Sequence, residues 1–436
     1  MQPLVTRPIV SLAPFRFDVT PPLGHALLGG LVPPAIAIDD ALEAIGYVLL
    51  SDAKPIVVCV LDWAGLMNSA HRRFRNALAN AAGTTLDRVA LHCVHQHNTP
   101  FVCETTRMLA AQHPELAPVF DPDFFTICLE RGADAVRVAL GQARPVTHIA
   151  HGRVAVQRVA SNRRVDRDER SNVRTMRGSA CTEPKLINLP EGTIDPNLQT
   201  VAYYSGKEKI VSCHYYATHP MSFYRDGRVT SDFCGLARKR RQRDEPHCAH
   251  LYFTGCAGNV AAGKYNDGSA AARVALTQRM YDAIVAAEEQ LRPEPVRALE
   301  WRIAEIQPRA RALPTINELG ATVGGPKAEQ VGKILRAYWQ SWRERTDRGE
   351  PLGLSCLRIN DVSLLHLPGE LFVEYQLKAQ RLREGSPVAV AAYGDGGPWY
   401  IPTELEYPSG GYENTVAFSE PTIDQQISAA MGQLLA

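Results

Sequence analysis

The sequence lacks the features that draw a protein to membranes or nucleic acids. No stretch approaches the about 20 consecutive apolar residues that a membrane span needs. Neither sign of charge is in excess, because 47 Lys and Arg stand against 46 Asp and Glu, a net charge of +1. Such a balance provides no bulk field for nucleic acid or an anionic surface. We therefore expect a globular protein with a small-molecule substrate, no nucleic-acid partner and no membrane span.

Paired cysteine motifs and an export leader are also missing. None of the ten cysteines forms a C-x-x-C pair, and several lie in apolar, strand-like runs. Buried free thiols in a reducing compartment are the favoured interpretation, with a disulfide framework as the alternative. Residues 1–8 contain no charged segment leading into an apolar one. The sequence thus predicts a cytoplasmic protein, although an exported form with its leader removed stays open, as does the oligomeric state.

Two common catalytic motifs are absent, whereas alternating strand and helix patterns are present. Without a G-x-S-x-G elbow, the serine triad of α/β-hydrolases is excluded, and the glycine-rich turn at 255–263 lacks the spacing of a phosphate loop. The alternation predicts an α/β fold, a mixed β-sheet core layered with helices. Strands are expected at 55–61, 88–97, 202–205, 209–217, 249–254, 354–360 and 362–367, and helices at 68–83, 124–142, 270–291 and 327–345. Residues 161–197 form the least regular stretch, a functional loop or a domain seam.

His95 and His97 form the sharpest candidate site. If the strand at 88–97 runs through both, the period of two places them on one face, with Cα atoms about 6–7 Å apart. Both imidazoles could then converge on one ion or substrate at a strand end, where open α/β sheets place their sites. The alternative is a pair of polar residues on an exposed edge.

Two further candidates follow other predicted strands. His219 comes after the strand at 209–217, and Glu370 comes just beyond the strand at 362–367. Together with His95 they match the three protein ligands of a catalytic zinc site. The alternatives are a structural histidine, and a glutamate favoured by the helix dipole in the first turn of the next helix.

A series of short motifs resembles the neutral/alkaline ceramidase family and spans nearly the whole chain. Each motif is weak alone, but their common order is specific. They are Phe17-Asp18-Val19-Thr20-Pro21-Pro22-Leu23-Gly24, His95-Gln96-His97-Asn98-Thr99-Pro100, Ser161-Asn162-Arg163-Arg164, Ile194-Asp195-Pro196, His219-Pro220, Pro368-Gly369-Glu370, Tyr400-Ile401-Pro402-Thr403 and Gly411-Tyr412-Glu413.

The resemblance implies a zinc-dependent, amidase-type catalytic domain covering 1–436, without the family's carboxy-terminal immunoglobulin-like domain. One Zn²⁺ per chain would be held by His95, His219 and Glu370. The residues implied in catalysis are His97, Arg163 and Tyr412. The substrate-binding candidates, which lie in the same motifs and glycine-rich loops, are Asn162, Asn259, Asp395 and Tyr400.

Two departures from the family pattern shape the expected chemistry. Ala261 stands where the family has its active-site serine, and the family's metal-binding tyrosine falls on Gly396 or Gly397. Asp395 or His97 is then left to complete the metal shell. The missing hydroxyl favours attack by a metal-activated water and argues against ceramide as the substrate.

Three functions remain open on the sequence. The leading hypothesis is a zinc-dependent hydrolase whose metal-bound hydroxide attacks the carbonyl of a small polar substrate, an amide first and a lactone or ester next. The second is a metal-dependent lyase or isomerase that acts on a sugar-like substrate through an enolate. The third is a non-catalytic binding protein.

Overall fold

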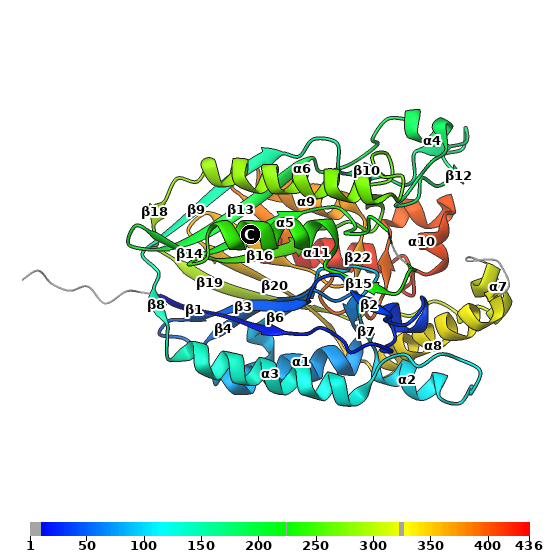
Figure 1. Cartoon of the computed structure of the whole chain (residues 1–436), viewed down its shortest axis with the longest axis horizontal. Helices are drawn as coiled ribbons and strands as arrows, with labels where there is room; N and C mark the ends of the chain where they lie inside the picture. The colour runs from blue at the N-terminus through cyan, green and yellow to red at the C-terminus, as the bar shows by residue number, and fades with distance from the viewer. Residues whose placement is uncertain (1–9, 224, 322–326) are drawn as a thin grey trace, which may run out of the picture.

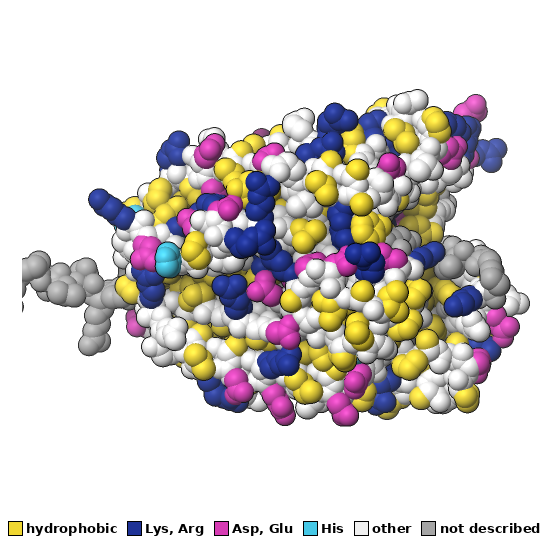
Figure 2. Space-filling model, in the orientation of Figure 1, with side chains coloured by type: hydrophobic (Ala, Val, Ile, Leu, Met, Phe, Trp, Pro, Cys, Tyr) yellow, Lys and Arg dark blue, Asp and Glu magenta, His cyan; other side chains and the backbone are white. Residues whose placement is uncertain are grey.

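The structure, a computed structural model, describes residues 10–223, 225–321 and 327–436. Residues 1–8, from which the absence of an export leader was predicted, lie outside these ranges. Within them, no helix is both long enough and apolar enough to cross a bilayer. On the face shown in Figure 2, basic and acidic side chains are interspersed, as the balanced composition predicts.

Two five-stranded sheets stack face to face and are covered by helices on their outer sides (Figure 1). Helices α1 and α3 pack on the first sheet, and α5 and α6 on the second. Between the sheets, the buried hydroxyl groups of Tyr47 and Tyr203 lie 3.1 Å apart. The first sheet has the order β6 (Val89–Cys93), β4 (Ile56–Leu61), β3 (Glu43–Leu50), β1 (Ser11–Asp18), β8 (Arg144–Pro145). The second has the order β16 (Ala249–Thr254), β14 (Glu208–Tyr216), β13 (Asn197–Ser205), β9 (His148–Ala155), β18 (Glu294–Pro295).

A third sheet of four strands adjoins the sandwich. Its order is β19 (Leu299–Ile306), β20 (Leu352–Ile359), β21 (Val362–His366), β23 (Val388–Ala391). The Ala392 amide, just after β23, donates to the Thr254 carbonyl at the end of β16, which links the third sheet to the second. The main helices are α1 (Asn68–Ala82), α3 (Pro122–Leu140), α5 (Asp232–Asp244), α6 (Ala270–Glu289), α8 (Ala328–Asp347), α9 (Val373–Leu382) and α11 (Ile423–Leu435).

Each large sheet contains one parallel pair of strands: β4 with β6, β14 with β16, and β21 with β23. All other pairings in these sheets are antiparallel. The predicted mixed α/β fold is therefore confirmed. Parallel strands need a crossover between them, and the loops at their carboxyl ends are free to carry functional residues.

Local sequence signals account for most of the helices and strands. Asp121 caps α3 by accepting from the amides of Asp123 and Phe124, and Pro122 occupies the first turn, where its missing N–H costs nothing. Helix α1 ends at Gly83, whose φ of 66° is the left-handed conformation that glycine adopts easily. All ten cysteines are buried and free, as predicted.

One local prediction is wrong. The strand predicted at 88–97 ends at Cys93, because the backbone turns into the left-handed region at His95, with a φ of 77°. In the irregular stretch 161–197, Arg163, Arg164 and Arg177 are buried. Their guanidinium groups hold this stretch against the rest of the molecule through hydrogen bonds to carbonyls, phenols and carboxylates.

Candidate metal centre

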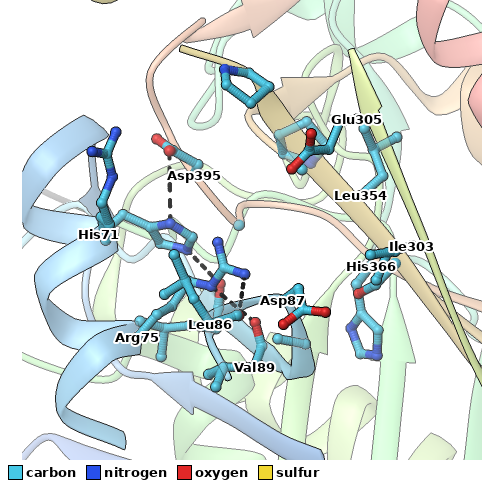
Figure 3. A pocket seen from close by; sticks show the side chains of 18 of the residues that line it. His71, Arg75, Leu86, Asp87, Val89, Ile303, Glu305, Leu354, His366 and Asp395 are labelled. Atoms are coloured by element: carbon cyan, nitrogen blue, oxygen red, sulfur yellow. Dashed lines mark hydrogen bonds and ion pairs between the residues drawn. The ribbon is translucent and has the colours of Figure 1, made fainter. Parts of the chain in front are cut away.

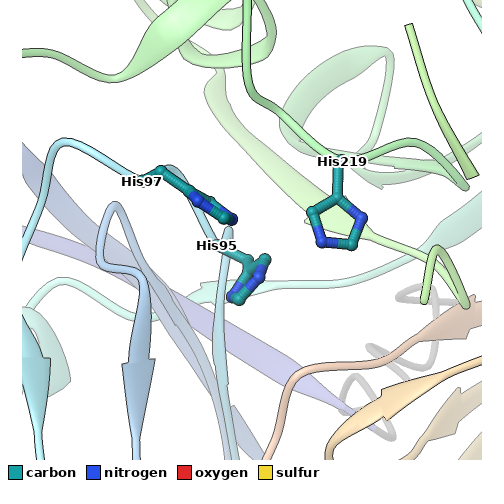
Figure 4. Close-up of side chains that lie close together, drawn as sticks. All are labelled: His95, His97 and His219. Carbon is teal, nitrogen blue, oxygen red and sulfur yellow. The ribbon is translucent and has the colours of Figure 1, made fainter. Parts of the chain in front are cut away.

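Residues from all three large sheets meet at the carboxyl ends of the parallel-paired strands. His95 follows β6 by two residues, His219 follows β14 by three, and Glu370 follows β21 by four. Tyr393 follows β23 by two. Figure 4 shows His95 and His97 on one segment with their rings close to that of His219 from another. The sequence prediction that these three histidines converge agrees with the structure, although a turn brings His95 and His97 together and not the pleat of a strand.

His95 is fixed by its own backbone and by its ring. Its amide donates to the Trp63 carbonyl at 2.8 Å, and its Nδ1 lies 2.6 Å from the Ala64 carbonyl oxygen. Because a carbonyl only accepts, Nδ1 carries the proton, and in a neutral ring Nε2 presents a lone pair. That lone pair faces Glu370, whose Oε2 lies 3.2 Å from Nε2 of the almost fully buried ring.

His219 is held in the same way from the opposite side. Its amide donates to the Val260 carbonyl at 3.0 Å, and its Nδ1 lies 2.7 Å from the Ala257 carbonyl oxygen. The ring has no exposed surface. Here too the hydrogen bond to a carbonyl assigns the proton to Nδ1 and leaves Nε2 as a lone-pair donor, the orientation common among metal-binding histidines.

Glu370 meets both imidazoles with a single oxygen. Its Oε2 lies 3.2 Å from Nε2 of His95 and 3.2 Å from Nε2 of His219. Two lone pairs and an ionised carboxylate oxygen repel one another at this distance when both rings are neutral. A cation between them converts the repulsion into attraction, so the three side chains fit a divalent ion.

The ionisation states of the cluster suit metal binding. Burial, reinforced by the charge of Arg163, lowers the pKa of His219 to about 3, and burial holds the pKa of His97 well below its usual value. For Glu370, burial favours the neutral acid, but attraction to the His95 and His219 imidazoles when these carry a second proton outweighs it and holds the pKa well below the usual value. Neutral imidazole and ionised carboxylate are the forms that ligate metals.

Two further side chains, His97 and Tyr393, lie beside the candidate ligands. The metal-binding atoms of His95, His97 and His219 all lie within 4.8 Å of one another. Tyr393 stacks on His95 with ring centroids 4.4 Å apart, and its hydroxyl lies 3.5 Å from Nδ1 of His219. Sequence reasoning missed Tyr393 and looked for a metal-binding tyrosine at Gly396 or Gly397. The only signal for it was an aromatic residue directly after a buried strand.

A cluster of hydrogen-bond donors adjoins the three candidate ligands. One Arg163 amino group donates to the Tyr412 hydroxyl at 2.6 Å and to the Tyr400 hydroxyl at 3.3 Å. The two phenols are 2.7 Å apart, and the Tyr400 hydroxyl lies 3.4 Å from Nε2 of His219. Burial raises the pKa of both tyrosines, so both remain neutral donors. Tyr412 is 37% exposed and connects this cluster to solvent.

Two of the predicted substrate-binding side chains, Asn162 and Asn259, are engaged in structural contacts. Asn162 donates to the Thr193 carbonyl and accepts from the Arg164 amide. Asn259 donates to the Glu374 carboxylate and accepts from the Val373 amide. Neither amide group is directed to the histidines by these bonds, so a role in binding substrate stays a prediction for both.

Asp395 belongs to a different polar cluster. Its carboxylate accepts from Arg345 at 2.5 Å and from the Asn68 amide at 2.9 Å, and it lies 3.7 Å from Nδ1 of His71. These partners neutralise and satisfy it, which leaves no reason to expect it in the shell of an ion held by Glu370.

Ala261, which stands where the family has its active-site serine, is inaccessible to solvent. Ala261 lies in β17 (Val260–Ala261), which pairs with β10 (Ser161–Asn162), and it has no exposed surface. The nearby Ser161 hydroxyl donates to the Ala261 carbonyl and accepts from the Lys264 amide. Ser161 is thus engaged in holding the two strands together.

A second group of ligand-type residues comprises His214 and His250 of the second sheet and Glu288 of helix α6. Lys209 and Arg241 donate to the two oxygens of Glu288 at 2.6 and 2.5 Å. With both oxygens paired to permanent cations, this group is an ion-pair network and not a metal centre.

The fold with these features is that of the neutral ceramidases. A solved structure titled "Ceramidase complexed with C2" matches with a TM-score of 0.75 and 15% identity, covering 98% of this chain and 75% of the other. The neutral ceramidase of Pseudomonas aeruginosa matches with a TM-score of 0.72 and 17% identity, covering 99% and 74%. A scan of known protein families and a search of curated proteins find no match.

Proposed function

We propose that the protein is a metal-dependent hydrolase that cleaves a carbonyl substrate, an amide in the first instance, with a lactone or ester next. The observation that supports the proposal most directly is the position of one Glu370 oxygen, Oε2. It lies 3.2 Å from Nε2 of His95 and 3.2 Å from Nε2 of His219. The opposite ring nitrogens are committed to backbone carbonyls, so the cluster cannot relieve its repulsion by exchanging tautomers.

In this proposal His95, His219 and Glu370 hold one divalent ion, zinc by the chemistry of two imidazoles and one carboxylate. When bound, the ion would lower the pKa of a coordinated water and polarise the substrate carbonyl. Tyr393 and His97 lie beside these ligands and are the candidates for the remaining contacts. The burial of the cluster strengthens every electrostatic interaction within it.

Arg163 and the two tyrosines would stabilise negative charge on the substrate. The Arg163 guanidinium is buried, and its side-chain partners are the Gly258 carbonyl, two phenols and the Ser179 hydroxyl, all of them neutral. Among the described residues, no carboxylate oxygen lies within 4.0 Å of the Arg163 guanidinium nitrogens, so none forms an ion pair with this side chain. A buried cation with neutral partners is well suited to an oxygen that gains charge in the transition state.

Proton transfer would fall to Tyr412 or His97. Tyr412 is hydrogen-bonded to Arg163 and Tyr400 and reaches solvent, so a proton lost to the leaving group can be replaced. His97 is the alternative, with its ring centroid 5.0 Å from that of His95. The attacking group is water, because Ala261 supplies no nucleophile.

The proposal is tested by comparing metal-free and zinc-loaded protein on a panel of amides, lactones, esters and sugar acids. We expect hydrolysis of at least one member by the zinc-loaded form only, with one solvent oxygen entering the product in labelled water. Solvent deuterium at carbon without solvent oxygen would assign the protein to the lyases or isomerases. Ligand binding without turnover in either form would assign it to the non-catalytic binding proteins.

A further inference from the structure

The turns that carry Glu370 and Tyr393 are bonded to each other through their backbones. The Tyr393 amide donates to the Gly369 carbonyl at 3.0 Å, and the Gly369 amide donates to the Asp395 carbonyl at 3.0 Å. The Glu370 amide donates to the Trp399 carbonyl at 2.8 Å. A shift of the segment 395–399 would therefore displace both Glu370 and Tyr393 relative to the two histidines.

Packing alone does not hold these turns in place. The segments 366–368 and 394–395 line a cavity of about 610 Å³, so part of their surface is not covered by packed side chains (Figure 3). Tyr393 and Trp399 have φ of 59° and 54°, a left-handed conformation that residues other than glycine adopt only where their surroundings impose it. Polar contacts must then supply much of the constraint that fixes this stretch.

The Asp395 carboxylate anchors the stretch to two helices. Its Oδ1 accepts from the amide of Asn68, the first residue of α1, at 2.9 Å, and from the Gly397 amide at 3.1 Å. Its Oδ2 accepts from Arg345 of α8 at 2.5 Å. Asp395 is 9% and Arg345 4% exposed, so removing either partner would leave a buried charge unpaired, which is strongly unfavourable.

Arg345 is the cation that balances Asp395. Among the described residues, no other lysine or arginine has a nitrogen within 4.0 Å of the Asp395 oxygens. His71 lies close, with its Nδ1 3.7 Å from Oδ2 (Figure 3). Its Nε2, however, lies 3.1 Å from the Leu91 carbonyl oxygen and therefore carries the ring proton, so a neutral His71 offers Asp395 no donor. Arg345 is fixed in turn by the Pro351 carbonyl, to which it donates at 2.6 Å.

We propose that the Asp395–Arg345 ion pair positions Glu370 and Tyr393 at the candidate metal centre. The pair fixes residues 395–397 against α1 and α8, and the backbone hydrogen bonds between the two turns transmit that position to both side chains. Asp395 and Arg345 do not touch the ion in this proposal. The role rests on the proposed function, because it presupposes an ion at Glu370, and it differs from the substrate contact predicted for Asp395 from the sequence.

The test measures the zinc affinity of the full chain by competition with a chelating dye, at a temperature where the variants compared are folded. Asp395→Asn keeps the size of the side chain but removes the charge that Arg345 balances. Arg345→Gln removes the cation, whereas Arg345→Lys retains it. Glu288→Gln is the matched control, because Glu288 also forms a buried ion pair, with Lys209, and none of its charged partners is a candidate ligand.

We expect Asp395→Asn and Arg345→Gln each to weaken zinc binding by about tenfold or more, as is typical for residues that orient metal ligands, and Arg345→Lys to weaken it less. Glu288→Gln should lose thermal stability and keep the zinc affinity of the wild type. Tyr393→Phe should cost less zinc affinity in the Asp395→Asn background than in the wild type, because Tyr393 is then already displaced.

Wild-type zinc affinity in both Asp395→Asn and Arg345→Gln would overturn the positioning role, even if their thermal stability falls. If Arg345→Gln does not fold, the comparison of Asp395→Asn with Arg345→Lys decides the point. A wild type that binds no zinc would overturn the metal centre and the positioning role together. Zinc binding that Asp395→Asn weakens, without hydrolysis of any member of the substrate panel, would support the positioning role and contradict only the proposed hydrolase.

Discussion

Tyr393 lies flat against His95, with ring centroids 4.4 Å apart and planes inclined by 26°. Both residues have a left-handed backbone, with φ of 59° for Tyr393 and 77° for His95. Such conformations cost of order 1–3 kcal/mol each and persist where surrounding structure imposes them, commonly at functional sites. The pair connects the first and third sheets at the point where the candidate ligands meet.

Tyr393→Phe should weaken metal binding or activity by about 10- to 100-fold while the fold is retained, because the ring keeps its stacking and only the hydroxyl beside His219 is lost. Metal affinity and turnover measure the effect. Tyr215→Phe, at a buried tyrosine in β14, serves as the control. Unchanged metal affinity together with unchanged turnover would show that the Tyr393 hydroxyl has no part in the site.

Arg163→Lys should lower kcat by about 10²–10³-fold with the metal content unchanged, because a single ammonium group cannot reach the two phenols and still face the substrate oxygen. Arg177→Lys is the matched comparison. Arg177 is also buried, but it donates only to backbone carbonyls, so its replacement should lower thermal stability and preserve the rate per folded molecule. Equal effects of both variants on kcat would contradict a role for Arg163 in stabilising charge.

Stability should decline with acid through the ion-pair network around Glu288 of α6, which joins this helix to α5 and to the second sheet. Burial opposes ionisation of Glu288, but His214 and Lys209 outweigh it and lower the pKa to about 2. The folded-state pKa lies below the unfolded one, so the stabilisation is complete above about pH 4.5 and is lost as the pH falls toward 2. Its size is about 3 kcal/mol at most, given the interval between the two pKa values.

Glu288→Gln should therefore lower the free energy of unfolding at pH 7 and flatten its decline between about pH 4.5 and 2. Urea unfolding at several pH values provides the measurement. Glu289→Gln, at the exposed neighbouring position, should show the same dependence of the free energy of unfolding on pH as the wild type. If the free energy of unfolding of Glu288→Gln fell with acid as steeply as that of the wild type, this account of the network would be contradicted.

Ala261→Ser should leave turnover nearly unchanged, because the proposed nucleophile is water and the position is fully buried between β10 and β17. Steady-state kinetics on whichever substrate is found decides the point. A gain of an order of magnitude or more, with an acyl-enzyme detected by mass spectrometry, would show that the site still supports a serine mechanism.

Much of the fold and the three candidate metal ligands can be predicted from the sequence, because the signals are local. Strand β16 coincides with the predicted 249–254, and α6 with most of 270–291. Residues His95, His219 and Glu370 each directly follow such a strand, and in an α/β fold strand ends gather at one edge.

The remaining features depend on contacts between distant segments. The left-handed turn at His95 is imposed by hydrogen bonds to Trp63 and Ala64, over 30 residues earlier. Tyr393 reaches His95 because the Cys93 amide, at the end of β6, donates to the Tyr393 carbonyl. The burial of Arg163 depends on Tyr400 and Tyr412, more than 230 residues later. None of these relations leaves a periodic pattern in the sequence.

The central claim, one divalent ion held by His95, His219 and Glu370, is tested most directly by elemental analysis of three purified proteins. The wild type and His113→Ala, changed at an exposed histidine outside the cluster, should each contain one zinc ion per chain. His219→Ala should contain less than about a tenth of that amount. A wild type that neither contains nor takes up a divalent ion, or a His219→Ala protein that keeps one ion per chain, would contradict the claim.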